Sequence, residues 1–171
     1  WKDESYSSTS WFEDSSVMRF IRRDRVRRNA ELCALDTRTG KVEVLISEAI
    51  EDANLSLQSA RHLKKRKEFI WWSERSGWGH YYLYGEDYKL KNAITSGAFR
   101  ASRIVSVDET LGVMYFRANG REGGNVYDEH LYRVRLDGSG LTLLDPGPGS
   151  HRSSLSPSKR YLVDNATAVD M

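Results

Sequence analysis

The stretch FIWWSERSGWGHYYLY, residues 69–84, decides the fold of this chain. Two runs of apolar and aromatic residues flank the short segment ERSGWG, which contains two glycines. Aromatic and β-branched residues favour strands, and glycine supplies the freedom that a tight turn requires. The stretch therefore predicts a β-hairpin with strands over residues 69–73 and 80–84, joined by a turn over 74–79.

Runs of the same kind recur along the chain. Counterparts of the first strand are 51, 44 and 47 residues apart and begin at residues 17, 68, 112 and 159. Second runs begin at residues 30, 80 and 130, and third runs, each within a segment that opens with a turn, follow from residues 37, 87 and 138. A further strand precedes the first run of the last three units, as in SRIVSVD from residue 102 and HRSSLSP from residue 151. The spacing indicates four strands per unit.

Units of this length with four antiparallel strands are typical of β-propeller blades. One small twisted sheet cannot bury both of its faces, so neighbouring units must cover each other. We predict an all-β chain, a partial β-propeller of four-stranded antiparallel blades. Residues 1–171 would form about three blades and the start of another, whereas a closed propeller usually has about four to eight.

Composition limits the alternatives. The chain of 171 residues is 39% hydrophobic and 29% charged, which is enough for a packed core. Its formal charge of +2 is too small to indicate a polyanionic partner for the whole chain. The single cysteine, Cys33, excludes an internal disulfide and a cysteine-rich zinc site, and we expect it in the core. No segment approaches the roughly 18 apolar residues of a membrane span.

Two basic segments need a separate interpretation. Residues 19–28 hold six arginines and residues 61–67 hold five lysines or arginines. Such patches can bind phosphate backbones, but Phe20 is the only aromatic residue inside the first one. We favour a solvated hairpin and loop and predict no nucleic-acid partner. The acidic residues expected to balance these charges are Glu43, Glu48, Glu51 and Asp52.

The four histidines could serve as metal ligands or general bases. We predict structural roles instead, because His80 and His130 occupy equivalent positions at the start of second strands. His62 and His151 are expected in loops or at strand edges. We therefore predict no catalytic, metal-binding or cofactor-binding residue and no cofactor, and the sequence does not identify substrate-binding residues.

The aromatic residues of the opening stretch allow two interpretations. They could line a carbohydrate or peptide site, but alternate residues of a blade pack against adjacent sheets. We expect core packing for all of them, with the turn residue Trp78 the least certain: Trp71, Trp72, Trp78, Tyr81, Tyr82 and Tyr84. The glycine-rich segment 120–130 is expected to be a hairpin loop rather than a phosphate-binding loop.

Several segments resemble the N-terminal β-propeller of dipeptidyl peptidase IV-like serine peptidases of the prolyl oligopeptidase clan, particularly the bacterial members. They are WWSERSGWGHYYLY (71–84), NAITSGAF (92–99), HLYRVRLDGSGLTLL (130–144) and GSHRSSLSPSKRYLVDNATAVD (149–170). Residues 1–68 fit less well. LDTRTGKVEVLI resembles a blade-closing hairpin of the family, but LSLQSARHLKKRKE matches nothing that we can place.

The resemblance implies a parent enzyme in which a propeller and a C-terminal α/β-hydrolase domain remove dipeptides from peptide N-termini. No G-x-S-x-G nucleophile motif occurs in the sequence, so we expect the hydrolase domain outside this chain. The family's pair of glutamates for the substrate amino group is also absent. The mixed acidic pairs do not carry its motif, and we transfer no role to Glu51-Asp52, Glu86-Asp87 or Asp128-Glu129.

The predicted function is thus that of a non-catalytic propeller portion, which gates and positions peptides for a hydrolase domain of the same protein. A stand-alone propeller that binds a protein, glycan or nucleic acid is the alternative. An open arc of blades leaves apolar sheet faces uncovered, so we also expect self-association. The resemblance suggests a periplasmic or exported protein.

Overall fold

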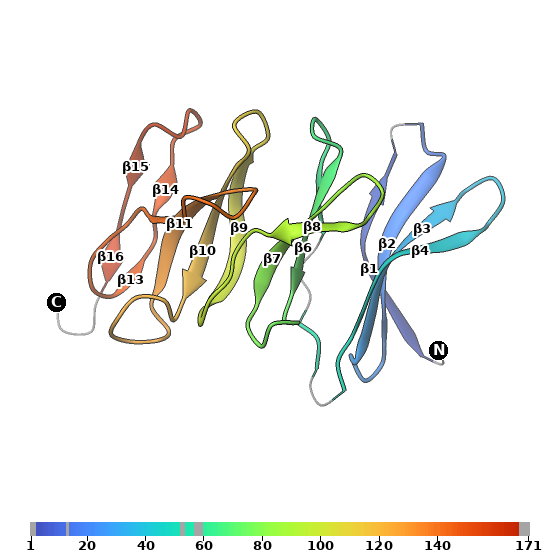
Figure 1. Cartoon of the computed structure of the whole chain (residues 1–171), viewed down its shortest axis with the longest axis horizontal. Helices are drawn as coiled ribbons and strands as arrows, with labels where there is room; N and C mark the ends of the chain where they lie inside the picture. The colour runs from blue at the N-terminus through green and yellow to red at the C-terminus, as the bar shows by residue number, and fades with distance from the viewer. Residues whose placement is uncertain (1–2, 13, 52–53, 57–59, 168–171) are drawn as a thin grey trace.

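The computed structural model describes all residues except 1–2, 13, 52–53, 57–59 and 168–171. In this part of the chain the regular structure is entirely β, and no helix is long and apolar enough to span a membrane. Figure 1 shows the sheets side by side in chain order, from the N-terminal sheet at the right to the last hairpin at the left.

Three four-stranded antiparallel sheets follow one another, each with its strands in sequential order. The first contains β1 (Glu4–Trp11), β2 (Val17–Asp24), β3 (Asn29–Asp36) and β4 (Val42–Ala49). The second contains β5 (Arg61–Leu63), β6 (Glu68–Ser73), β7 (His80–Tyr84) and β8 (Leu90–Ala93). The third contains β9 (Arg100–Asp108), β10 (Val113–Asn119), β11 (Glu129–Arg135) and β12 (Thr142–Leu143).

The chain then forms one hairpin whose ladder is interrupted. Its strand pairs are β13 (Ser150–His151) with β16 (Ala166–Thr167), and β14 (Ser154–Leu155) with β15 (Leu162–Val163). We call the boundary between the first and second sheets the first seam. The second seam lies between the second and third sheets, and the third seam lies between the third sheet and the last hairpin.

The core consists of two clusters, one in each of the first two seams. In β6, Phe69 and Trp71 pack in the first seam, whereas Ile70 and Trp72 pack in the second. This is the two-residue period of a strand, with apolar side chains on both faces. The sheet is therefore covered on both sides, and every residue of β6 and β7 is buried.

The decisive hairpin forms as predicted. Phe69 pairs with Tyr84 and Ser73 with His80 across the 74–79 turn. Gly77 has a φ of 87°, which favours glycine. A Cβ on Gly79 would lie 2.2 Å from Cζ2 of Trp72, so the close approach of the indole requires glycine.

The structure confirms the fold class and the repeat but differs at both ends. β1 is a full strand of the first sheet, whereas the sequence analysis assigned no strand before residue 17. Its sequence ESYSSTSW has no apolar alternation, and six of its eight residues are exposed. In the last unit the strand expected from residue 159 begins only at Leu162 and is interrupted before Ala166.

Candidate functional site

The four histidines fall into different environments. His80 Nδ1 lies 3.1 Å from Thr95 Oγ1, and His80 Nε2 lies 3.0 Å from the carbonyl of Gly97. Burial lowers the pKa of His80 below 6.5, and its bond to Gly97 opposes this shift only partly. His62 lies in the edge strand β5 and stacks on Phe69 with ring centroids 4.6 Å apart.

His130 and His151 meet in the third seam, with ring centroids 4.7 Å apart. Asp145 lies beside them, and its Oδ1 is 3.6 Å from His130 Nδ1 and accepts the Leu131 N–H at 2.7 Å. All three side chains are buried. The sequence analysis expected no metal-binding group, but the structure brings together two imidazoles and a carboxylate whose ligand atoms all lie within 4.8 Å of one another.

Two further side chains complete this arrangement, which we call the third-seam cluster: His130, Asp145, His151, Ser153 and Asp164. His151 Nδ1 lies 2.6 Å from Asp164 Oδ2. Ser153 Oγ lies 2.9 Å from Asp164 Oδ1 and also within hydrogen-bond distance of Asp145, and its one proton is shared between these two acceptors. Burial alone would lower the pKa of His151, but the hydrogen bond and charge of Asp164 raise it above 6.5. The bonds from His151 and Ser153 likewise outweigh burial and lower the pKa of Asp164.

The cluster contains a serine, histidines and aspartates, yet the hydrogen bonds among them differ from those of an acyl-transfer triad. In a triad the serine hydroxyl donates to a histidine, which is oriented by a carboxylate. Here Ser153 hydrogen-bonds to the carboxylates of Asp145 and Asp164 and not to a histidine. Ser153 is 6% exposed. This geometry does not activate Ser153 as a nucleophile.

A cavity of about 410 Å³ opens at the first seam. Its lining joins the two basic segments with aromatic residues of the first sheet: Trp11, Phe12, Asp14, Arg19, His62 and Lys64. Arg19 is 6% exposed, and its guanidinium lies 4.0 Å from the Phe12 ring centroid. Arg19 Nε donates to the Tyr88 hydroxyl at 3.0 Å. The cavity thus combines a fixed buried cation with aromatic walls.

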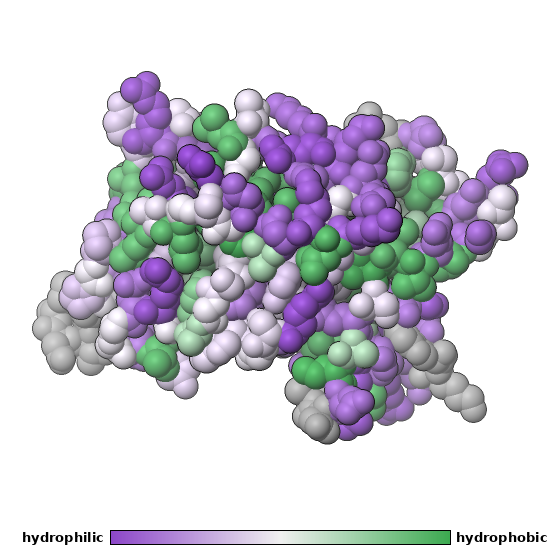
Figure 2. Space-filling view, in the orientation of Figure 1, coloured by the Kyte–Doolittle hydropathy of each residue, from purple (hydrophilic) through white to green (hydrophobic). Residues whose placement is uncertain are grey.

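Four of the other cations in the basic segments form ion pairs, with partners other than the expected ones. Ion pairs join Arg22 to Glu31, Arg25 to Asp3, Arg66 to Glu68 and Lys67 to Glu86. Glu48 instead accepts from Trp71 Nε1 at 2.9 Å and from Ser73 Oγ inside the first seam. Asp52 lies outside the described residues. Figure 2 shows hydrophilic residues gathered over the β5–β6 and β7–β8 turns.

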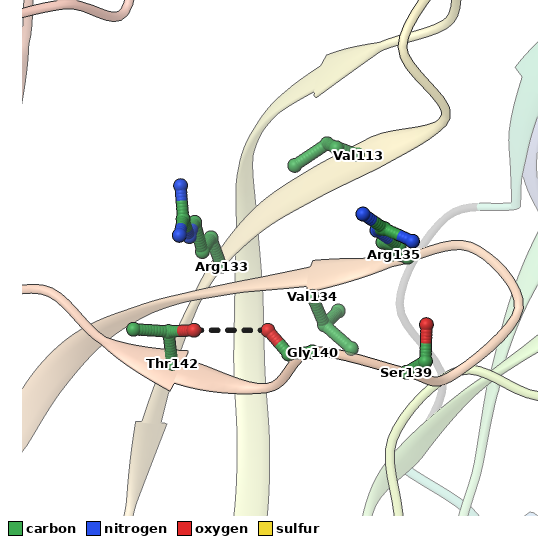
Figure 3. Close-up of a pocket in the computed structure, with 7 residues that line it drawn as sticks. All are labelled: Val113, Arg133, Val134, Arg135, Ser139, Gly140 and Thr142. Atoms are coloured by element: carbon green, nitrogen blue, oxygen red, sulfur yellow. Dashed lines mark hydrogen bonds between the residues drawn. The ribbon is translucent and has the colours of Figure 1, made fainter.

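A second cavity, of about 330 Å³, lies beside the β11–β12 hairpin. Figure 3 shows Arg133 and Arg135 pointing to one side of β11, toward Val113, while Val134 points to the other. Thr142 Oγ1 donates to the Gly140 carbonyl at 3.0 Å and holds the hairpin turn. The cavity is a solvent-facing notch with two exposed arginines, and no buried polar group is among its lining residues.

The aromatic residues of the opening stretch pack as predicted. Trp71, Trp72, Tyr81, Tyr82 and Tyr84 are buried. Trp78 is the exception, with 46% of its surface exposed. Segment 120–128 joins β10 to β11 as the expected hairpin loop, and Cys33 is buried.

Sequence reasoning missed the third-seam cluster because its members come from separate parts of the chain. Asp145 and Asp164 were not singled out, and His151 was treated as a strand-edge residue. One signal was available: where the second unit has Thr95 and Phe99 after its third run, the third unit has Asp145 and His151.

Stacked four-stranded antiparallel sheets in chain order define this protein as a β-propeller chain. Residues 2–171 match the family described as the dipeptidyl peptidase IV (DPP IV) N-terminal region, and the chain belongs to this family. The resemblance found in the sequence is thus confirmed.

Two solved structures show the same fold. Dipeptidyl peptidase 4 of Porphyromonas gingivalis matches with a TM-score of 0.73 and 14% identity, over 94% of this chain and 22% of that protein. A candidate dipeptidyl aminopeptidase IV of Bacteroides ovatus matches with a TM-score of 0.72 and 21% identity, over 95% of this chain and 26% of that protein. The chain therefore corresponds to a minor part of each of these proteins.

Proposed function

We propose that this chain is a non-catalytic part of the propeller of a dipeptidyl peptidase IV-like serine peptidase. It would restrict and position peptides for an α/β-hydrolase domain that lies outside residues 1–171. Membership of the DPP IV N-terminal family over residues 2–171 carries the proposal. The missing G-x-S-x-G motif and the unsuitable partners of Ser153 support it.

A wall that selects by size must resist splaying, and buried hydrogen bonds cross all three seams. Glu48 of the first sheet binds Trp71 and Ser73 of the second. Trp72 Nε1 donates to the Ala101 carbonyl of the third sheet at 2.7 Å.

Arg117 closes the third seam, because its guanidinium donates to the carbonyls of His151 and Ser153. Breaking any of these bonds would leave buried polar groups unpaired, at about 1–3 kcal/mol each. These buried hydrogen bonds support the proposed role, because they oppose separation of the sheets.

The first test compares hydrolysis of a glycyl-prolyl chromogenic substrate by residues 1–171 and by the full-length protein. We expect no turnover by residues 1–171 and clear turnover by the full-length protein. Turnover by residues 1–171 would refute the non-catalytic assignment. No turnover in either form would favour a stand-alone binding module, for which the first-seam cavity with Arg19 is the best docking site in the described structure.

Gating itself is tested in the full-length protein with Glu48→Ala, which loosens the first seam. Glu43→Ala is the matched control, because Glu43 lies on the same strand and is exposed. We expect Glu48→Ala to raise the cleavage of long peptides relative to a dipeptidyl substrate, and Glu43→Ala to leave this ratio unchanged. An unchanged ratio in a folded Glu48→Ala protein would count against exclusion by the wall.

A further inference from the structure

We propose that the third-seam cluster is a structural binding site for a zinc-type divalent ion, with His130, Asp145 and His151 as ligands. The site would join the third sheet to the following hairpin. It is independent of peptidase activity and adds to the proposed gating role a metal that locks one seam.

The chain contains an internal reference for this site. In the second seam the Tyr81 N–H donates to Thr95 Oγ1 at 3.0 Å, and His80 meets Phe99 with ring centroids 5.0 Å apart. In the third seam the Leu131 N–H donates to Asp145 Oδ1 at 2.7 Å, and His130 meets His151 at 4.7 Å. Asp145 thus takes the place of Thr95, and His151 takes the place of Phe99.

This comparison separates what the fold requires from what the third seam adds. In the second seam, Thr95 accepts the equivalent backbone N–H and Phe99 makes the equivalent ring contact. The third seam instead buries a carboxylate and a second imidazole, and burying such groups is costly unless they are paired or bind a metal. The extra groups are nitrogen and oxygen donors, the types that bind zinc.

The distances allow the site to close with small movements. Zinc binds nitrogen and oxygen at about 2.0–2.2 Å, so its ligand atoms are separated by roughly 3.4 Å. Asp145 Oδ1 and His130 Nδ1 are already 3.6 Å apart, and an ion at Nδ1 would replace its 3.2 Å contact with the Asp145 carbonyl. The three ligand atoms lie within 4.8 Å of one another, so side-chain shifts of about 1 Å would bring them to one ion, with water as the fourth ligand.

An outer layer of hydrogen bonds already orients the ligands. Asp164 holds His151 Nδ1 at 2.6 Å, so an ion would bind Nε2 of this ring in place of its 3.4 Å contact with the Gly147 carbonyl. Ser153 Oγ lies between the two carboxylates, within hydrogen-bond distance of both, and so links their positions. Metal-binding histidines commonly use a carboxylate partner in this way, and loss of the partner typically weakens binding 10- to 100-fold.

Charge also suits a divalent cation. Arg117 is the cation nearest this cluster in the contacts described. Its Nε lies 3.7 Å from Glu129 Oε2, and its charge also acts on Asp164. Asp145 and Asp164 are the carboxylates that face the two imidazoles. A cavity of about 540 Å³ is lined in part by Gly149 and Ser150, which directly precede His151, so it lies next to the cluster in the chain.

The test measures zinc binding to the full-length protein after treatment with a chelator and dialysis. We expect a site in the third seam with a stoichiometry of one, which calcium does not occupy because two ligands are nitrogen. Saturating zinc should raise the thermal midpoint by about 5 °C or more. No zinc binding would overturn the proposal.

Two of the variants copy the second seam, so they test the ligands with residues that the fold already accommodates there. His151→Phe and Asp145→Thr should each weaken zinc binding at least about 100-fold, and Asp164→Asn should weaken it about 10- to 100-fold. His80→Gln removes the matched histidine of the second seam and should leave zinc binding unchanged. Unchanged binding in folded His151→Phe would assign the ion to another site and refute the proposal.

Zinc K-edge X-ray absorption of the loaded wild-type protein gives an answer that does not depend on the variants. We expect two imidazole ligands, further oxygen ligands and no sulfur. A spectrum with fewer than two imidazoles would overturn the proposal.

Discussion

Replacement of Gly79 by alanine is expected to open the second seam. Gly79 directly precedes β7, and a Cβ there would lie 2.2 Å from Cζ2 and 2.9 Å from Cε2 of Trp72. Trp72 is 1% exposed, and its Nε1 donates to the Ala101 carbonyl at 2.7 Å. Because the indole has no open space to enter, it must displace its neighbours or give up this hydrogen bond.

The cost follows from these two effects. Overpacking a core typically costs about 1–3 kcal/mol. A buried carbonyl that loses its donor costs about 1–3 kcal/mol more. We expect a loss of about 3 kcal/mol for Gly79→Ala, near the middle of the combined range. For a chain of this size, such a loss lowers the thermal midpoint by about 6–12 °C.

Thermal and urea unfolding followed by circular dichroism measure this loss. Gly123→Ala is the control, because a Cβ on Gly123 has nothing within 4 Å and its φ is not in the left-handed region. Trp72→Phe removes the ring atoms that clash, so Gly79→Ala should cost much less in that background than in the wild type. A loss below about 0.5 kcal/mol, or an equal loss in both backgrounds, would refute the clash with Trp72 as the cause.

Three further predictions concern stability and association. Glu48→Ala should cost about 3 kcal/mol in urea unfolding, because two buried donors lose their acceptor, whereas Glu43→Ala should cost less than about 0.5 kcal/mol. The hydrogen bonds of Lys91 and Arg66 outweigh burial and lower the pKa of Glu68 below 4.5, so its stabilising contribution is present above pH 4.5 and lost as the pH falls through the lowered value. Urea midpoints between pH 2.5 and 6 should show this loss in the wild type and a smaller one in Glu68→Gln. The exposed apolar side chains of the last hairpin predict that residues 1–171 self-associate, and sedimentation should show a mass that rises with concentration.

The fold could be predicted because local signals and tertiary packing agree in the central units. β6 has apolar residues on both faces, so its sequence carries the information that a sheet lies on each side. Some turns are marked by glycine, as at Gly77, whereas others have Arg27, Lys67 or Lys159 at a positive φ. The serine-rich β1 lacks this signal, because its place in the sheet comes from pairing with β2 rather than from an apolar face.

The third-seam cluster could not be predicted in the same way. His130 and Asp145 are 15 residues apart, and Asp164 is 13 residues beyond His151. No short motif joins them, and they meet only when the last hairpin closes against β11. His80 and His130 occupy equivalent positions, which favoured the same structural role for both. The residues around the two histidines nevertheless differ.

Different polar groups join the sheets at the three seams, and this difference affects which sheets can stack on one another. The first seam is joined by a carboxylate and an indole, the second by an indole and a backbone carbonyl, and the third by a guanidinium and the His–Asp cluster. Sheets of similar shape could otherwise stack in more than one order, since apolar burial alone discriminates weakly between them. A mismatched seam would bury Glu48 or Arg117 without its partners, at a cost of several kcal/mol. The polar groups in the seams therefore act against incorrect stacking of the sheets.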